Sequence, residues 1–471
     1  MQKMFLTNIN NPKKNINQAL IVTFGLLLSI GASFLVSKGS SEFTWVICAC
    51  LAISFWSMRP ESLFCYWLAC FPLADYLIRY PAQQAVITFA RIVVMLLSFG
   101  VVARLIKNEK IRLNLGWFEL SWMLFALYAL ADCLLQNSFS LSTLRTAVDG
   151  FILPLILFVI VRHCLDIKKI SEEILIGLMI LAYLILPVGL YELKTGVDLL
   201  AYPGGELFFD GRIRPNGPFL ADHSYALISL ILGLTLVYWP KIANIVIEGR
   251  YKILWCGAVV SAFLSALIPQ FRAVMLAMVV CLVLGQCLTS GWRSLIKPFV
   301  IVALLLVAGT PIWLALSDTT FYQQRIADTA NLSSRIMTYK KALEVAQSNP
   351  MGVGLGNYEN YFNQRWAIKE QPEKEKLGEL AQSTPHSNFL SVLAELGIIG
   401  LILYLVAHLA LIYTAWKTAK HSGHTSGVTV ILLVIAYAGV GLTLTSGYYY
   451  DLNLFFFCCL GMLLGRGVVK A

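Results

Sequence analysis

Long apolar runs constrain this chain more than any other feature of its sequence. Runs of about 17–25 residues recur along the 471 residues, and each is long enough to cross a bilayer as a helix. Only 13% of the residues are charged, whereas 58% are hydrophobic. We therefore expect an all-α, polytopic integral membrane protein with about 14 transmembrane helices. The predicted spans are 19–37, 42–58, 61–78, 84–104, 117–135, 144–164, 172–192, 220–239, 251–269, 272–289, 295–317, 386–416, 427–447 and 451–469.

The basic residues predict how these spans are oriented. About twenty of the 36 Lys and Arg fall in loops on the side of the N-terminus, against about seven in the short loops of the other side. This asymmetry predicts that both termini are cytoplasmic and that residues 318–385 form one large loop outside. The net charge of +10 therefore reports orientation in a lipid bilayer and does not indicate a nucleic-acid partner. We expect a bundle of about 11 spans in 1–317, the loop in 318–385, and about three spans in 386–471.

A histidine stands where the long polar segment meets the next apolar run, in Thr384-Pro385-His386-Ser387-Asn388. Thr384 suits a helix N-cap and Pro385 the first helical position, which places His386 in the first turn of a helix. The helix dipole disfavours positive charge there, so the imidazole should stay neutral and able to accept a proton. Alternatively, His386 simply satisfies a helix end or faces lipid head groups. His223 occupies a similar position and is a rival.

Several arginines lie where spans meet the outer surface. Arg212 and Arg214 are in a Gly- and Pro-containing segment, Arg272 is in a short turn, and Arg335 is in the long loop. Guanidinium groups bind phosphate through two parallel hydrogen bonds, so such a ring of arginines suits a diphosphate. Alternatively, each arginine snorkels to lipid head groups.

Arg91 is a separate case, because it lies inside a predicted span, where a lone charge is costly. It either binds phosphate or forms a purely structural ion pair. The carboxylates that could form this pair are Asp75, Asp132, Asp149 and Glu395.

Residue patterns for metal binding are lacking in the sequence. No span carries a carboxylate–histidine cluster suited to Zn²⁺, and no outer loop has the Asp-x-Asp spacing that would hold Mg²⁺ beside a diphosphate. His421 and His424 have a ligand-like spacing but stand in a predicted cytoplasmic loop without Cys or carboxylate neighbours. We expect neither a metal nor another cofactor.

Three segments together resemble the O-antigen ligase and polymerase family of bacterial envelope glycosyltransferases. The first is Arg214-Pro215-Asn216-Gly217-Pro218-Phe219, similar to the family's Arg-x-x-Gly-x-Phe run. The second begins at Ser334-Arg335 and ends with Asn349-Pro350-Met351-Gly352-Val353-Gly354-Leu355-Gly356-Asn357-Tyr358. The third combines His386-Ser387-Asn388-Phe389-Leu390 with Glu395-Leu396-Gly397-Ile398-Ile399-Gly400. One departure is Phe271-Arg272, where the family often has Ser-Arg.

This resemblance implies a GT-C-type membrane fold and a metal-independent glycosyltransferase of the bacterial inner membrane, with its active site facing the periplasm. The donor would be a glycan on undecaprenyl diphosphate, and the acceptor a sugar hydroxyl. It implies that Arg214 and Arg272 hold the diphosphate, that His386 deprotonates the acceptor, and that Arg335 shapes the loop or touches phosphate. The remaining candidates are Arg212 and Arg91 for the diphosphate, with Gly217, Phe219, His223, Asn388 and Glu395 in support.

Two functional questions stay open at this point. Ligation of a glycan to a lipid A core and polymerisation of repeat units share all three segments, so the sequence does not separate them. A transporter or flippase of lipid-linked oligosaccharide would also need arginines near the membrane surface. Transporters usually show two related halves with broken helices at corresponding positions, and no such repeat is visible in the sequence.

Overall fold

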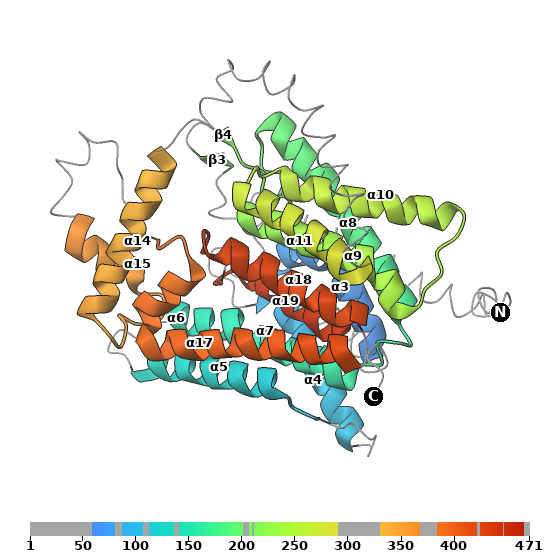
Figure 1. Ribbon diagram of the computed structural model, residues 1–471, viewed down its shortest axis with the longest axis horizontal. Helices are drawn as coiled ribbons and strands as arrows, with labels where there is room; N and C mark the ends of the chain where they lie inside the picture. Colours follow the sequence, from blue (N-terminus) through green and yellow to red (C-terminus); the bar gives the residue numbers. More distant parts are fainter. Residues whose placement is uncertain are drawn as a thin grey trace. The chain divides into compact units, whose positions relative to one another are not determined.

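The computed structural model describes residues 59–80, 87–106, 113–135, 141–200, 207–209, 212–290, 330–367, 384–421, 424–445 and 447–465. These residues are helical apart from loops and two short antiparallel strand pairs (Figure 1). The chain divides into two compact units, Met1–Asn108 and Glu109–Ala471. The predicted spans 19–37, 42–58 and 295–317 lie outside the described residues.

In the described part of the N-terminal unit, two apolar helices pack on each other. Asp75 near the end of the first helix accepts the N–H of Ala90 at 2.6 Å, which satisfies a first-turn group that has no partner within the helix. The second helix begins at Phe89, so Arg91 lies in its first turn. The elements of this unit are α3 (Pro60–Leu77), β1 (Arg79–Tyr80), β2 (Ile87–Thr88) and α4 (Phe89–Ile106).

The second unit contains all remaining described helices. Its elements are α5 (Trp117–Leu135), α6 (Leu141–Ala147), η1 (Val148–Ile152), α7 (Leu153–Val159), η2 (Ile160–Cys164), α8 (Ser171–Thr195), β3 (Phe208–Phe209), β4 (Arg212–Ile213), α9 (Asp222–Ala243), α10 (Arg250–Leu267), α11 (Arg272–Ser290), α14 (Ala330–Ser348), α15 (Tyr358–Phe362), η5 (Asn363–Ala367), α17 (Asn388–His421), α18 (His424–Gly441) and α19 (Tyr450–Leu463).

Nine of the described helical segments are long and apolar enough to cross a membrane, and each overlaps a predicted span. The segments are Phe89–Ile106, Trp117–Leu135, Ser142–Cys164, Ser171–Thr195, Asp222–Ala243, Arg250–Leu267, Arg272–Thr289, Asn388–His421 and His424–Gly441. The predicted spans 61–78 and 451–469 also contain helices, α3 and α19, but neither is among the nine. A polytopic membrane architecture is therefore confirmed for the described part of the chain.

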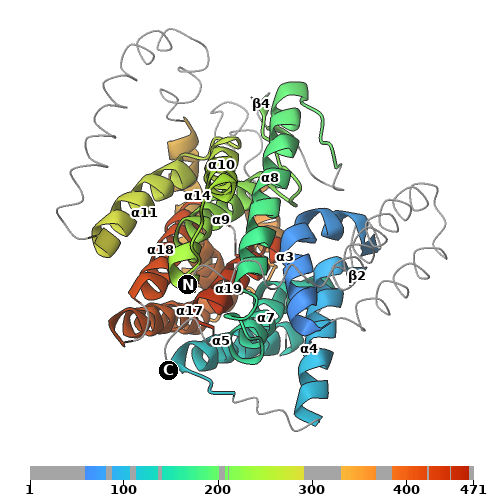
Figure 2. The ribbon, with the colours of Figure 1, turned by 90° about the vertical axis from the view of Figure 1, so that its right-hand side faces the viewer.

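Helix α9 forms the centre of the second unit. It is the most buried of the membrane-length helices among the described residues, with 78% of its apolar window covered by the rest of the chain. It packs against α8, α10, α11, α18 and α19. Figure 2 shows α11 alongside α18, and in Figure 1 α17 runs along α5.

Part of the segment predicted as a long polar loop is helical. Helices α14, α15 and η5 form a small hydrophobic core of their own, which rests on α17 through Ala394. The core residues contributed by the segment are Ala342, Val345, Tyr358, Phe362 and Trp366. Because α14 is polar on average, mean hydropathy alone does not reveal this packing.

The glycine-rich loop that follows α14 docks on a kink in α17 through backbone hydrogen bonds. The kink is at Gly397, where the backbone leaves helical geometry with φ 67° and ψ −167°. The N–H of Ile398 donates to the carbonyl of Pro350 at 3.1 Å, and the N–H of Gly354 donates to the carbonyl of Glu395 at 2.8 Å. Two of the three sequence motifs are therefore joined to each other.

Glycine is required on both sides of this docking contact. A Cβ on Gly397 would lie 2.4 Å from the Pro350 carbonyl oxygen, and a Cβ on Gly352 would lie 2.1 Å from the Glu395 carbonyl oxygen. Real Cβ atoms do not approach backbone so closely. The glycines in the second and third motifs thus serve close approach between two chain segments.

Candidate functional site

The arginine loop, residues 214–219, is a tight turn after the β3–β4 hairpin. The N–H of Arg214 donates to the carbonyl of Leu207 at 2.6 Å. Gly217 has φ +56°, and a Cβ there would lie 2.9 Å from the ring of Tyr225. Phe219 is buried and stacks on the same tyrosine, with 5.9 Å between ring centroids. Gly217 and Phe219, both predicted as supporting residues, therefore shape this loop.

Two buried carboxylates hold this region by its backbone. Glu192, in the last turn of α8, accepts the N–H of Gly217 at 2.8 Å. Asp451, in the first turn of α19, accepts the N–H of Leu220 and the hydroxyl of Ser224, each at 3.2 Å. Burying a carboxylate is costly unless it is hydrogen-bonded, so these contacts fix the path of the chain into α9.

The guanidinium of Arg214 lies beside a carboxylate and an aromatic ring. One guanidinium nitrogen is 3.8 Å from an oxygen of Asp222, and the guanidinium carbon is 5.5 Å from the ring centroid of Phe271. Arg272 follows Phe271 directly, begins α11 and is exposed. The turn before α11 is therefore adjacent to the arginine loop, and Arg214 lies where the two meet.

Asp222 also orients His223. Nδ1 of the imidazole is 2.9 Å from the Asp222 carboxylate, which favours the tautomer with a proton on Nδ1 and leaves Nε2 as an acceptor. Among the residues that the structure describes, Nε2 is buried without a hydrogen-bond partner. The ring meets Tyr449 edge-on, with 4.2 Å between centroids. This Asp–His arrangement is one that enzymes use to prepare a general base.

His386 precedes α17 instead of lying in its first turn, which corrects the sequence prediction. The helix begins at Asn388, and His386 adopts a left-handed conformation with φ +48°. Burial, reinforced by the charges of Arg335 and His223, lowers the pKa of His386 to about 4. The imidazole is thus neutral at neutral pH, as predicted, but burial is the main cause and not a helix dipole.

Contacts from α14 connect the long polar segment to His386. The hydroxyl of Tyr339 donates to the carbonyl of Leu442 at 3.0 Å and lies 3.5 Å from that of His386. Arg335, one turn earlier on α14, is half-buried, and its charge acts on both Tyr339 and His386. Arg335, His386 and His223 therefore gather in one region of the second unit.

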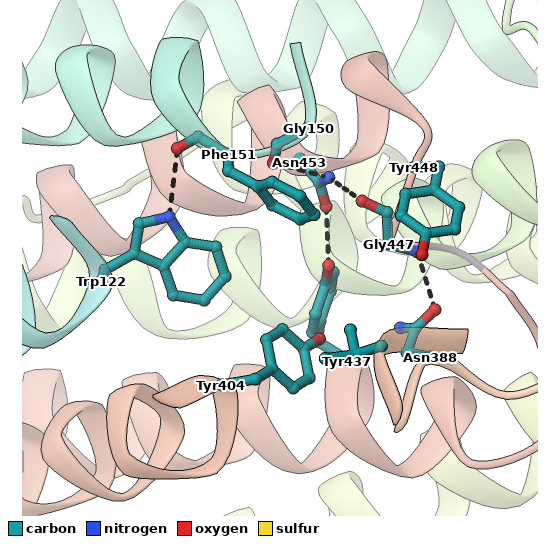
Figure 3. Close-up of a pocket in the computed structure, with 10 residues that line it drawn as sticks. Trp122, Gly150, Phe151, Asn388, Tyr404, Tyr437, Gly447, Tyr448 and Asn453 are labelled. Atoms are coloured by element: carbon teal, nitrogen blue, oxygen red, sulfur yellow. Dashed lines mark hydrogen bonds between the residues drawn. The ribbon is translucent and has the colours of Figure 1, made fainter. Parts of the chain in front are cut away.

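A small cavity lies beneath the first turn of α17 (Figure 3). It is walled mainly by aromatic side chains and has room for about one water molecule, so it is too small for a sugar ring. At its edge the side-chain oxygen of Asn388 accepts the N–H of Gly447 at 2.7 Å, and Asn453 donates to the Gly447 carbonyl at 2.6 Å. Asn388 thus holds the turn that leads to Tyr449, the residue packed on His223.

The other predicted residues have different surroundings. Glu395 is buried and accepts hydrogen bonds from the Tyr448 hydroxyl and the Tyr358 N–H, so it secures the docked glycine-rich loop. Arg91 belongs to the N-terminal unit, and its role stays a prediction. The backbone of Arg212 pairs with Phe209, and the Arg212 side chain lies outside the described residues.

Sequence reasoning did not identify four residues that build this region: Glu192, Asp222, Tyr449 and Asp451. Each carboxylate stands at or near the end of an apolar run, where an acidic residue is uncommon and signals a specific contact. Tyr449 carries no such signal. In the described part of the chain, no three His, Cys, Asp or Glu side chains gather closely enough to hold a metal ion.

Part of the chain matches a model of a known protein family. Residues 256–405 match the family model described as O-antigen ligase, from within α10 to within α17. The match includes Arg272, Arg335, His386 and Glu395, whereas the arginine loop precedes it. No curated protein matches the chain. This match confirms the resemblance predicted from the motifs for the part of the chain between residues 256 and 405.

Proposed function

We propose that this protein is a membrane glycosyltransferase of the bacterial inner membrane. It transfers an oligosaccharide or polysaccharide from undecaprenyl diphosphate to a sugar hydroxyl on the periplasmic side. The observation that carries the proposal is the clustering of Arg214 and the Phe271–Arg272 turn with two histidines, His223 and His386. A guanidinium for the leaving diphosphate and a neutral imidazole for the acceptor are the two groups that such a transfer requires.

The transfer is one displacement at the anomeric carbon. The acceptor hydroxyl loses its proton to an imidazole nitrogen while its oxygen forms a bond to the anomeric carbon. The bond between that carbon and the phosphate oxygen breaks, and undecaprenyl diphosphate leaves with the electron pair. The negative charge gained by the leaving group is stabilised by Arg214 and Arg272, whose guanidinium groups bind phosphate oxygens in pairs.

The surroundings of Arg214 suit a competing anion. Its ion pair with Asp222, at 3.8 Å, is longer than a hydrogen bond, so a diphosphate can approach the same guanidinium and form shorter contacts. Asp222 would then keep its bond to His223. Arg335, which is close enough to influence His386, is the candidate for contact with the distal phosphate.

His386 is the proposed base, and its low pKa has a consequence for the mechanism. With a pKa of about 4, the imidazole is unprotonated at neutral pH but holds a proton weakly. A bound diphosphate brings negative charge to this region, and nearby negative charge raises the pKa of a histidine. Donor binding would thereby strengthen the base. His223 is the rival, because Asp222 orients its ring as in other Asp–His pairs.

Reconstitution of the purified protein in liposomes tests the proposal. The vesicles contain a glycan on undecaprenyl diphosphate together with either a lipid A core acceptor or a second lipid-linked repeat unit. We expect a covalent glycan product and released undecaprenyl diphosphate, and the acceptor that is used separates ligase from polymerase. Movement of the intact donor across the bilayer with no covalent product would favour a flippase and refute the proposal.

A further inference from the structure

Glu192 is an unusual residue for the end of a membrane helix. Its side chain is fully buried, and a buried carboxylate is costly unless it is hydrogen-bonded, so it indicates a specific role. One carboxylate oxygen accepts the N–H of Gly217 in the arginine loop at 2.8 Å. The backbone N–H groups of Asn216, also in the loop, and of Leu199 act on the same carboxylate. Two of these three N–H groups therefore belong to the arginine loop.

The packing around Gly217 leaves the arginine loop little freedom. The ring of Tyr225 on α9 would lie 2.9 Å from a Cβ on Gly217, and its hydroxyl would lie 2.2 Å from a Cβ on Gly189 of α8. The same hydroxyl donates to the Ile185 carbonyl at 3.1 Å. Because Tyr225 contacts α8 and the loop together, its ring limits the positions that Gly217 can take.

We propose that Glu192 is a positioning residue for the lipid-linked diphosphate, acting through its hydrogen bond to Gly217 in the arginine loop. This inference rests on the proposed function, in which Arg214 binds that diphosphate. Arg214 lies three residues before Gly217, and its own N–H is tied to Leu207. Because both ends of this short segment are held, the backbone position of Arg214 is fixed before the donor binds. This reduces the free-energy cost of ordering the loop on binding.

We expect removal of the Glu192 carboxylate to weaken binding of the lipid-linked donor. Without Glu192, the buried N–H of Gly217 has lost its acceptor, and the loop must move to find another. The Arg214 side chain is then displaced, and the loop must be reordered when the donor binds, which makes the free energy of donor binding less favourable. Glutamine keeps a carbonyl oxygen where the carboxylate oxygen is, so it preserves the bond to Gly217. The prediction is therefore specific to loss of the acceptor and not to loss of charge.

The test compares Glu192→Ala, Glu192→Met and Glu192→Gln in the purified full-length protein, with the lipid-linked glycan as donor. We expect the Ala and Met variants to raise the donor KM by about tenfold to a hundredfold, with a smaller change in kcat, as for a lost hydrogen bond to a charged group. Glu192→Gln should stay within about threefold of the unaltered protein. The control is Glu173→Ala, an exposed position at the other end of α8, which should change nothing.

Coupling to the loop is tested with Gly217→Ala, alone and combined with Glu192→Ala. If both act on the same loop, the two losses in donor affinity do not add. Glu192→Met keeps the side-chain volume, so it provides the comparison should the Ala variant fail to fold. A wild-type donor KM in a folded Ala or Met variant overturns the inference, as does an equal loss in Glu192→Gln.

Arg214→Ala separates this inference from the proposed function. A raised donor KM in Arg214→Ala, with an unchanged one in Glu192→Met, refutes the role of Glu192 alone. An unchanged donor KM in Arg214→Ala refutes the diphosphate assignment and this inference with it.

Discussion

Replacement of Gly397 by alanine should release the glycine-rich loop from α17. The φ of 67° and ψ of −167° at Gly397 lie in a region that is essentially restricted to glycine, and a side chain there costs about 1–3 kcal/mol in backbone strain. The added Cβ would also lie 2.4 Å from the Pro350 carbonyl oxygen. A carbon–oxygen contact needs about 3.3 Å, so the loop must retreat by roughly 1 Å.

A retreat of that size weakens the hydrogen bonds that dock the loop. The bonds from Ile398 to Pro350 and from Gly354 to Glu395 are 3.1 Å and 2.8 Å long, and each contributes about 1 kcal/mol net. The weakened hydrogen bonds and the backbone strain together should destabilise the docked state by about 2–5 kcal/mol relative to the undocked one. The equilibrium constant for undocking of the loop from α17 should therefore rise at least about thirtyfold.

Hydrogen exchange measures this opening directly. In Gly397→Ala, the amides of Gly354 and Ile398 should exchange at least about thirtyfold faster, while amides in the centre of α9 keep their protection. Gly352→Ala should act in the same way, because its Cβ would lie 2.1 Å from the Glu395 carbonyl oxygen. Gly439→Ala is the matched control, since nothing lies within 4 Å of a Cβ there. If Gly397→Ala and Gly439→Ala exchange alike, the docking account is wrong.

Four further predictions concern topology and chemistry. In a protein without native cysteines, a membrane-impermeant thiol reagent added outside should label cysteine at 360 and not at 420, and the opposite pattern would invert the topology. Transfer should continue in excess EDTA, and activity that is lost and then restored by Mg²⁺ or Mn²⁺ would exclude the arginine-based mechanism. Arg272→Lys should weaken donor binding, measured as a raised KM, because ammonium cannot bind phosphate bidentately; unchanged affinity would remove Arg272 from the site. As pH is lowered, kcat/KM should stay high well below pH 6.5 and fall only near pH 4, because the lowered pKa leaves the His386 imidazole unprotonated over that range. An acid limb near pH 6.5 that moves in a His386 variant would contradict this.

The nine spans found among the described residues were predictable because a bilayer imposes a minimum apolar length on any helix that crosses it. The run 117–135 coincides with α5, and 272–289 differs from α11 by one residue. The helices of the polar segment were not predictable in this way. The apolar residues that they bury, such as Val345 and Phe362, stand among many polar ones. A hydropathy average over a window therefore does not register the core that they form with Ala394 of α17.

The candidate site was only partly predictable for a related reason. Arg214 and His386 stand out because charged and titratable groups are rare in such a chain. Their setting depends on contacts between segments far apart in the sequence, such as that of Asp451 with the chain entering α9. The conformation of His386 also escaped prediction, since the N-cap pattern at Thr384 suggested a helix that in fact begins at Asn388.

Single-turnover transfer by purified His386→Ala and His223→Ala, with saturating lipid-linked donor, tests the central claim most directly. A general base contributes about 10²–10⁴-fold, so His386→Ala should slow glycosyl transfer by at least about a hundredfold while donor binding and thermal unfolding stay near those of the unaltered protein. His223→Ala should retain most of the rate. Near-normal transfer by His386→Ala, with a large loss in His223→Ala, would assign the base to the Asp222–His223 pair. Normal transfer by both variants would contradict imidazole catalysis in this protein altogether.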